Sequence, residues 1–143
     1  MEIVNGERLV LGTCYYPEHW DESLWRDDLR RMLENGIEVI RIAEFAWSKI
    51  ERYEGVFNYD FFDRFLDVAA DMGMKVIFCT PTATPPAWLT EKYPEVLNAN
   101  MDGVLYRHGG RRHYNYNSPK YQELTRIIVE KSASHLSLIH ISE

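Results

Sequence analysis

"NGIEVIRI" (residues 35–42) and "MGMKVIFC" (residues 72–79) are two versions of one pattern, offset by 37 residues. In both, a glycine is followed by an apolar residue, a charged residue and the pair Val-Ile. Short apolar runs of this kind are typical of buried strands in parallel sheets. A repeat of this length corresponds to about one β/α unit.

Working outward, the surrounding segments predict an alternating order of strands and helices. Asp21 is predicted to cap the first helix, and Asn35-Gly36 and Gly73 are predicted to end the two helices. Within residues 58–73, an apolar face recurs at helical spacing, made of Phe61, Phe65, Val68, Ala69 and Met72. The predicted strands are 8–16, 37–45 and 74–80, and the predicted helices are 20–36 and 58–73.

Parallel β/α units build either an open doubly wound sheet or a closed (β/α)8 barrel. The sequence has no Gly-x-Gly-x-x-Gly turn after its first predicted strand, which disfavours the dinucleotide-binding version of the open sheet. The barrel is therefore the favoured interpretation.

Residues 82–119 are rich in Pro, Gly and Asn and are too long for a plain connection. Loops of this length in compact domains are usually functional, and in a barrel this one would lie on the face that carries active sites. Ser118 and Pro119 then predict the start of a last helix over 119–135, with Leu124, Ile127 and Ile128 facing inward.

Composition excludes several function classes. The chain has 143 residues, 45% of them hydrophobic, so a folded core is expected. Sixteen basic and 22 acidic residues give a net charge of −6, which disfavours nucleic acid and membrane surfaces as partners. The N-terminus lacks a signal-peptide pattern, so a cytoplasmic location is expected. Cys14 and Cys79 are isolated in sequence and are expected to be reduced core residues.

Two charged residues stand at the carboxyl end of the second predicted strand. Side chains alternate along a strand, so Arg41 should point to one side of a buried sheet, with Glu44 just beyond it. A buried guanidinium is costly unless it is paired, which implies a carboxylate partner. Two interpretations remain open. Arg41 forms a local ion pair with Glu44 or Glu18, or it lies beneath a catalytic carboxylate and holds that group ionised and oriented.

Aromatic and polar residues cluster at the ends of the predicted strands. "YYPEHW" (15–20) suits a sugar pocket, because aromatic faces stack on pyranose rings and carboxylates bind hydroxyls. Trp88 is either a stacking platform or a buried residue under the long loop. "RRHYNYNSP" (111–119) offers bulky polar donors that suit hydroxyl recognition, although a solvated basic loop is the alternative. No catalytic Ser-His-Asp or Cys-His spacing and no metal-binding histidine pattern is found.

Several of these segments resemble, together and in order, the opening of glycoside hydrolase family 42, whose members are mostly β-galactosidases. They are "LGTCYYPEHW", "IRIAEFAWSKIERYEGVFNYDFFDRFLD", "GMKVIFCTPTATPPAWL", "YPEVL" and "GRRHYNYNSPKY". The resemblance runs from about residue 9 to residue 135. It implies an α/β fold, an incomplete (β/α)8 TIM barrel made of the first three β/α units.

The resemblance also implies a retaining exo-β-galactosidase that removes terminal non-reducing β-D-galactosyl residues from a β-galactoside or galacto-oligosaccharide substrate. Its acid/base is the Glu of an Asn-Glu pair after strand 4 and its nucleophile is a Glu after strand 7, so both are expected beyond residue 143. By similarity Arg111 contacts galactose, while Arg41 and Glu44 support the active site. Asn115 stands where some members have a zinc-binding cysteine, so no metal or other cofactor is expected. The intact enzyme is expected to form a homotrimer.

The resemblance predicts a fragment, with residues 1–135 as the N-terminal part of a glycosidase barrel. Residues 136–143, "LSLIHISE", resemble translated sequencing-adaptor DNA and are expected to carry no selected structure. Such a fragment is expected to be inactive alone and to aggregate. The alternatives are a carbohydrate-binding module and a fragment of a related barrel glycosidase that is specific for another sugar.

Overall fold

The computed structural model describes residues 9–139, which form two compact units. The first unit takes in the residues up to 43 and residues 59–79. The second takes in residues 44–58 and the chain from residue 80 onward. Both units are therefore discontinuous in sequence.

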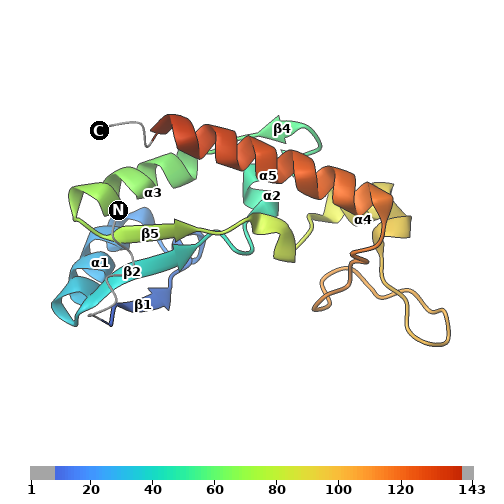
Figure 1. Cartoon of the computed structure of the whole chain (residues 1–143), viewed down its shortest axis with the longest axis horizontal. Coiled ribbons are helices and arrows are strands. Elements are labelled where there is room, and N and C mark those ends of the chain that lie inside the picture. Colours follow the sequence, from blue (N-terminus) through green and yellow to red (C-terminus); the bar gives the residue numbers. More distant parts are fainter. Residues whose placement is uncertain (1–8, 140–143) are drawn as a thin grey trace. The chain divides into compact units, whose positions relative to one another are not determined.

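The first unit is built on a parallel sheet of three strands, seen in Figure 1. Strand β2 (Ile37–Ile42) lies between β1 (Leu11–Cys14) and β5 (Lys75–Phe78). Helix α1 (Trp25–Glu34) lies between β1 and β2 in the chain, and α3 (Asp60–Asp71) precedes β5. The predicted α/β class is confirmed, and the predicted alternation of strands and helices holds for this unit.

Local signals set the ends of these helices. The Asp21 carboxylate accepts a hydrogen bond from the backbone N–H of Ser23 at 2.9 Å. It thereby caps a 3-10 turn, η2 (Glu22–Leu24), that leads into α1; a second 3-10 turn, η1 (Pro17–His19), precedes it. Gly36 and Gly73 follow the two α-helices with φ of 79° and 71°, a left-handed conformation that glycine adopts without strain.

The core of the first unit is aromatic. The Trp25 ring packs edge-to-face on Phe61 and Phe65, with centroid distances of 5.2 and 5.1 Å, and Phe62 packs on Phe78 at 5.3 Å. The predicted inward stripe of α3 is only partly right. Phe65 and Ala69 are buried as predicted, while the other buried positions are Phe62 and Leu66. Because Phe61 and Phe62 are adjacent, the sequence pattern did not show which of the two faces the core.

The helices cover one face of this sheet and leave the other open. Ile40 and Ile42 are fully buried, whereas Leu11 and Ile77 are about half exposed. Arg41 alternates with the two buried isoleucines and is exposed. The prediction of a buried Arg41 guanidinium is therefore wrong, because within residues 9–139 no helix or strand covers that face of the sheet. For the same reason Cys14 is exposed, not a core residue, although both cysteines are free as predicted.

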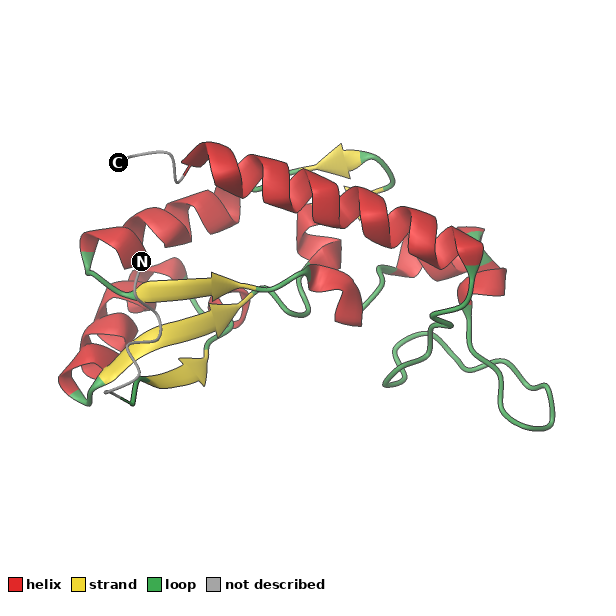
Figure 2. Ribbon diagram, viewed as in Figure 1, coloured by secondary structure: helices red, strands yellow, loops and turns green. Residues whose placement is uncertain are grey.

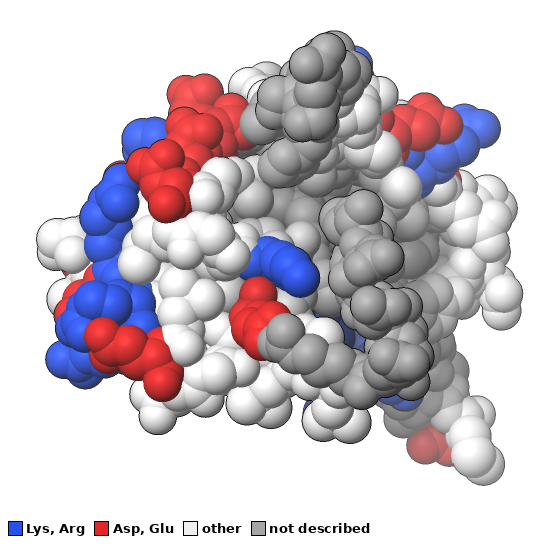
Figure 3. Space-filling model, turned by 60° about the vertical axis from the view of Figure 1, so that its left-hand side comes forward, with Lys and Arg blue, Asp and Glu red and all other residues white. Residues whose placement is uncertain are grey.

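Charged side chains of the first unit pair across its surface. Arg26 bonds Asp71 at 2.9 Å, and Arg64 bonds Glu22 at 2.6 Å. On the face drawn in Figure 3, basic and acidic side chains lie side by side instead of forming a field of one sign. Exposed pairs of this kind contribute little stability individually.

The second unit contains more regular structure than its sequence suggested (Figure 2). Residues 44–58, predicted as strand end and loop, form a short helix and a two-stranded antiparallel hairpin. Residues 82–119 include a helix and two 3-10 turns at their start. In order, the elements are α2 (Trp47–Ile50), β3 (Glu51–Tyr53), β4 (Val56–Phe57), η3 (Pro81–Ala83), α4 (Ala87–Lys92), η4 (Pro94–Val96) and α5 (Pro119–Ile139).

Helix α5 begins where the sequence predicted. Ser118 Oγ accepts the backbone N–H of Tyr121 at 3.3 Å, which confirms Ser118 as the cap. Leu124 and Ile128 are buried as predicted, and Ile127 is half-buried. The helix continues past residue 135 to Ile139, while residues 140–143 lie outside the described part. The foreign origin of 136–143 stays a prediction.

Within residues 9–139, no helix combines the length and the apolar character that crossing a membrane requires.

Candidate functional site

A cleft of about 950 Å³ opens in the second unit between three segments of the chain. The first follows strand β2, the second contains the proline-rich stretch after β5, and the third is the basic end of the long loop. The lining residues are Glu44, Phe45 and Ser48; Ala83, Thr84, Pro85, Pro86 and Ala87; and His108–Tyr114 with Tyr116. Glu44 and Arg111, both predicted as site residues, therefore line the same cleft.

The first wall is anchored by a carboxylate that sequence analysis did not single out. Glu51 is 3% exposed, and its carboxylate accepts hydrogen bonds from Trp47 Nε1 at 2.7 Å and Gly55 N at 2.8 Å. Its backbone oxygen accepts from Trp88 Nε1 at 3.0 Å. The four-residue spacing between Trp47 and Glu51 was the available signal. Trp88 is thus an anchor of the wall and is not among the residues that line the cleft.

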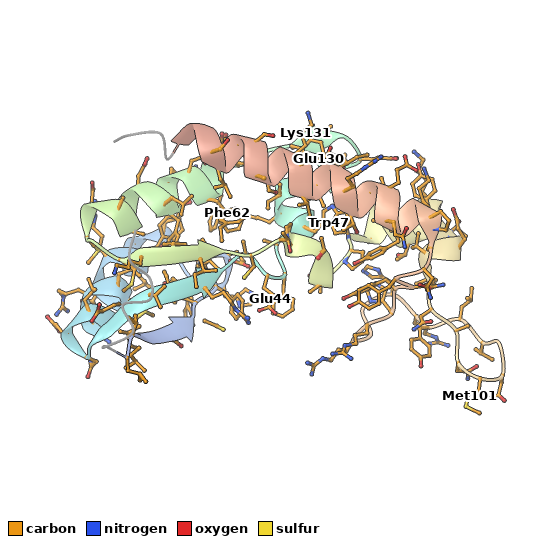
Figure 4. All side chains as sticks on the ribbon, in the orientation of Figure 1. Glu44, Trp47, Phe62, Met101, Glu130 and Lys131 are labelled. Carbon is orange, nitrogen blue, oxygen red and sulfur yellow. The ribbon has the colours of Figure 1, made fainter. Side chains whose placement is uncertain are left out.

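The basic segment is held by the pairing of the long loop with itself. Asn98 N donates to His113 O at 2.7 Å, and Asn115 N donates to Val96 O at 2.8 Å. The outer part of the loop turns at Met101, which lies at its far end in Figure 4. The inner part therefore has fixed partners close to η4, which positions the lining residues that follow Arg107.

Two arginines reach the cleft from this segment. Arg111 and Arg112 are both exposed and both line the cleft. Arg112 has φ of 56°, in the left-handed region that few non-glycine residues adopt. Backbone strain of this sort costs on the order of 1–3 kcal/mol and is concentrated at binding and catalytic sites. The sequence singled out Arg111 and gave no signal for the strained backbone of Arg112.

Two histidines, His108 and His113, also line the cleft, and the Nδ1 atom of each forms a hydrogen bond. His113 Nδ1 lies 2.7 Å from Gly110 O, so this nitrogen carries the proton. Thr90 Oγ1 donates to Ala87 O at 3.1 Å and lies 2.9 Å from His108 Nδ1. Because Thr90 donates its only hydroxyl proton to Ala87 O, His108 Nδ1 carries a proton and donates it to Thr90 Oγ1. Burial, and secondarily the neighbouring His113, lower the pKa of His108.

Three tyrosines form a rigid block behind the basic segment. Tyr114 stacks on Tyr121 with ring centroids 4.8 Å apart, and both rings meet Tyr116 edge-to-face. Tyr121 donates its hydroxyl proton to Thr82 O at 2.8 Å. Burial raises the pKa of Tyr121 to about 12 and raises the pKa of Tyr114 as well, so both hydroxyls are neutral near pH 7.

The remaining candidates belong to the first unit. Arg41 stands at the exposed face of β2, and Tyr15, Tyr16, His19 and Trp20 line a hollow of about 400 Å³. Burial raises the pKa of Tyr15, and its hydroxyl donates to the Asp28 carboxylate at 2.8 Å.

Asn115 stabilises a turn before helix α5. The side-chain oxygen of Asn115 accepts the backbone N–H of Asn117 at 2.9 Å, a local turn that leads to the Ser118 cap. An amide in this role supplies no thiolate for zinc. Among residues 9–139, no three histidine, cysteine or acidic side chains gather closely enough to hold a metal ion.

Comparison with known proteins identifies the family. A family model described as beta-galactosidase matches residues 14–138. The chain belongs to glycoside hydrolase family 42. Beta-galactosidase BgaA of a Thermus species is 48% identical over 120 residues, and beta-galactosidase Bga of Halorubrum lacusprofundi is 43% identical over 121 residues.

Solved structures of this family agree. The crystal structure of beta-galactosidase from the psychrophilic Marinomonas ef1 superposes with a TM-score of 0.84 at 42% identity, over 87% of this chain and 19% of that one. The beta-galactosidase from Bacillus circulans sp. alkalophilus superposes with a TM-score of 0.86 at 30% identity. The Thermus match covers 84% of this family 42 chain and 19% of the relative, so the chain spans about a fifth of that relative's length, in its N-terminal part.

Proposed function

We propose that this chain is the N-terminal piece of a retaining exo-β-galactosidase and supplies the first three β/α units of a (β/α)8 barrel. The observation that carries the proposal is the family 42 match over residues 14–138, which contains the whole cleft. Relatives at 41–48% identity are named beta-galactosidases, which supports a terminal β-galactosyl group as the substrate. The proposed location is the cytoplasm, and the intact enzyme is proposed to be a homotrimer.

In this proposal the cleft binds the sugar and the reaction is completed by carboxylates from elsewhere in the barrel. Retaining hydrolysis needs two carboxyl groups about 5–5.5 Å apart, one as nucleophile and one as acid/base. Glu44 belongs to the segment after β2 and is proposed to support the site, as is Arg41. No metal or other cofactor is required by this chemistry.

The proposal assigns the galactose contact to Arg111. A guanidinium that lines a cleft can donate two hydrogen bonds to neighbouring hydroxyls. Arg112 is the second candidate, because it lines the same cleft and its backbone has a left-handed conformation of the kind that clusters at binding and catalytic sites. A hydrogen bond to a charged group contributes about 1.5–3 kcal/mol, so losing the contacting arginine should lower kcat/KM on the order of 10- to 100-fold.

The test is a hybrid enzyme in which residues 14–135 replace the matching segment of the Thermus beta-galactosidase. The hybrid is expected to hydrolyse nitrophenyl β-galactoside and to prefer it over the matching β-glucoside and α-arabinoside. Arg111→Ala should show the loss given above, and Arg112→Ala is measured beside it. The chain of residues 1–143 alone is expected to show no turnover.

A folded hybrid that hydrolyses no β-galactoside would overturn the proposal. So would turnover by the isolated chain, since that would require a complete pair of catalytic carboxylates within it. Loss of activity in Arg112→Ala with full activity in Arg111→Ala would move the galactose contact to Arg112.

A further inference from the structure

Of the Asp, Glu, Lys and Arg side chains in residues 9–137, Glu51 is the one that is buried. Its two carboxylate oxygens accept hydrogen bonds from Trp47 Nε1 and from Gly55 N, and neither donor carries a positive charge. A buried carboxylate without a cationic partner is costly. Such a group can nevertheless fix one arrangement of the chain where an apolar contact would allow several.

Trp47 connects Glu51 to the first wall of the cleft. Its ring is fully buried and packs on Tyr121 of α5, with centroids 6.4 Å apart. Glu44 and Ser48, which lie on either side of Trp47 in the chain, both line the cleft. A hydrogen bond that fixes the Trp47 indole therefore fixes the backbone from which these two side chains reach the cleft.

The start of this wall carries backbone strain. Ala43, which directly precedes Glu44, is fully buried and has φ of 66°, in the left-handed region that residues with a Cβ seldom adopt. Strained conformations persist only where the surrounding structure over-determines them, and they cluster at functional sites. The hydrogen bond between Trp47 and Glu51 holds the other end of this short segment.

The backbone of Glu51 reaches the second wall of the cleft. Its carbonyl oxygen accepts a hydrogen bond from Trp88 Nε1 at 3.0 Å. Trp88 lies in the first turn of α4, directly after the cleft-lining residues 85–87. Glu51 therefore joins two of the three segments that form the cleft, through the indole N–H groups of two tryptophans.

We propose that Glu51 is a positioning residue that fixes the spacing of these two walls, and with it the affinity of the cleft for the galactosyl group. This role rests on the function proposed above. Glu51 is not among the residues that line the cleft, so it acts through Trp47 and Trp88. Releasing the walls should weaken the binding of substrate and transition state alike, which raises KM and leaves kcat unchanged.

The experiment measures KM and kcat of the hybrid enzyme with nitrophenyl β-galactoside. Glu51→Gln keeps the shape of the side chain but turns an NH₂ group toward one of the two N–H donors. KM should rise on the order of tenfold, while kcat per folded molecule should stay within about twofold. If Glu51 only stabilised the fold, the folded fraction and the apparent kcat would fall at unchanged KM, and that result would overturn the positioning role.

A double-mutant cycle tests whether Glu51 acts through Trp47. Trp47→Phe removes the indole N–H, so the amide of Glu51→Gln can turn its oxygen to Gly55 N without facing a second donor. The effect of Glu51→Gln on KM should therefore be smaller in the Trp47→Phe background than in the parent. Equal effects in the two backgrounds would show that Glu51 does not act through Trp47.

Glu54 provides a matched control in the turn of the β3–β4 hairpin. Its carboxylate pairs with Lys92 and accepts the Tyr93 hydroxyl at 2.7 Å, and it does not line the cleft. Glu54→Gln should leave KM within about twofold, since exposed ion pairs contribute little. If Glu51→Gln does not fold, Trp88→Phe releases the second wall with Glu51 intact and should also raise KM. An unchanged KM in that variant would contradict the role.

A hybrid inactive on every β-galactoside would instead contradict the proposed function. Hydrogen exchange on the folded hybrid then tests Glu51 without any need for activity. Glu51→Gln should speed the exchange of backbone N–H groups in residues 44–49 and 87–90 and leave helix α3 as in the parent. Unchanged exchange in both walls would overturn the positioning role.

Discussion

His108 shows how a single side chain at the cleft responds to its neighbours. Its ring lies edge-to-face against His113, with centroids 4.9 Å apart, and its Nδ1 is engaged by Thr90. Burial and the nearby histidine both disfavour the charged imidazolium, so the pKa of His108 lies below its ordinary value of 6.5. Near neutral pH the ring is uncharged and leaves the positive charge of the cleft to the arginines.

The lowered pKa of His108 predicts a direction for stability against pH. As the pH is lowered, the unfolded chain takes up this proton near pH 6.5, at a higher pH than the folded protein does. The contribution of neutral His108 to the free energy of unfolding is therefore fully present above pH 6.5 and falls as the pH drops toward the pKa of the folded protein. An NMR titration should place the His108 midpoint below 6.5. His113→Phe should move that midpoint up toward 6.5, and a midpoint at or above 6.5 in the parent would contradict this reasoning.

At the residue scale, the resemblance to glycoside hydrolase family 42 named Glu44 and Arg111 as site residues, and both line one cleft. The prediction that Arg41 is buried was wrong, since alternation along a strand tells which side chains share a face but not which face is covered. Glu51 was missed because its partners are nearby side-chain and backbone N–H groups that no charge pattern reveals.

At the scale of elements, α5 depends on its first turn. Ser118 is 4% exposed, and its hydroxyl satisfies the backbone N–H of Tyr121, one of the donors that a helix start leaves without a helical partner. Because Pro119 follows at the first helical position, the start of α5 is fixed by two adjacent residues.

Removing this cap should destabilise the protein measurably. Ser118→Ala is expected to lower the free energy of unfolding by about 0.5–2 kcal/mol. Urea unfolding followed by tryptophan fluorescence gives the value, since Trp47 lies 6.4 Å from Tyr121 of α5 between ring centroids. Ser134→Ala, the same change at an exposed position of α5, is the control and should be neutral or slightly stabilising. Equal effects at the two sites would show that the cap is not important.

Long periodic elements were predictable and short ones were not. Helices α1, α3 and α5 have apolar residues at helical spacing over several turns, and their ends carry Asp21, Gly36, Gly73 and Ser118 as signals. The hairpin of β3 and β4 contains only five strand residues, too few for an alternation to be recognised. Helix α4 follows two prolines, and proline was counted as a loop residue in 82–119 although it also suits a helix start.

At the scale of the whole molecule, the open face of the β1–β2–β5 sheet is the main liability. Parallel sheets are usually covered on both faces, and β1 and β5 are edge strands in the described structure. Ile77 is 46% exposed there and is the cross-strand partner of Arg41. An apolar side chain in this position invites association between copies of the isolated chain.

Ile77→Glu should therefore raise the concentration at which the isolated 143-residue chain begins to scatter light. The new carboxylate stands at an exposed position opposite Arg41 across the parallel strand pair, so folding should not suffer. Ile40→Glu, at a fully buried position of the covered face, is the contrasting variant and should abolish folding. Unchanged scattering by Ile77→Glu would mean that another surface drives association.

The division into two units has a consequence for how the protein is made. The chain passes from one unit to the other after residues 43, 58 and 79, so neither is a continuous segment. During synthesis the sheet of the first unit must wait for β5, and by then the hairpin that belongs to the second unit has already emerged. Trp47 and Glu51 can form their hydrogen bond as soon as both have emerged. Tyr121, whose ring lies next to that of Trp47, is synthesised only with the last helix. A nascent chain whose first 80 residues have emerged from the ribosome would thus display a finished first unit together with an exposed Trp47, which is the form that a chaperone would meet.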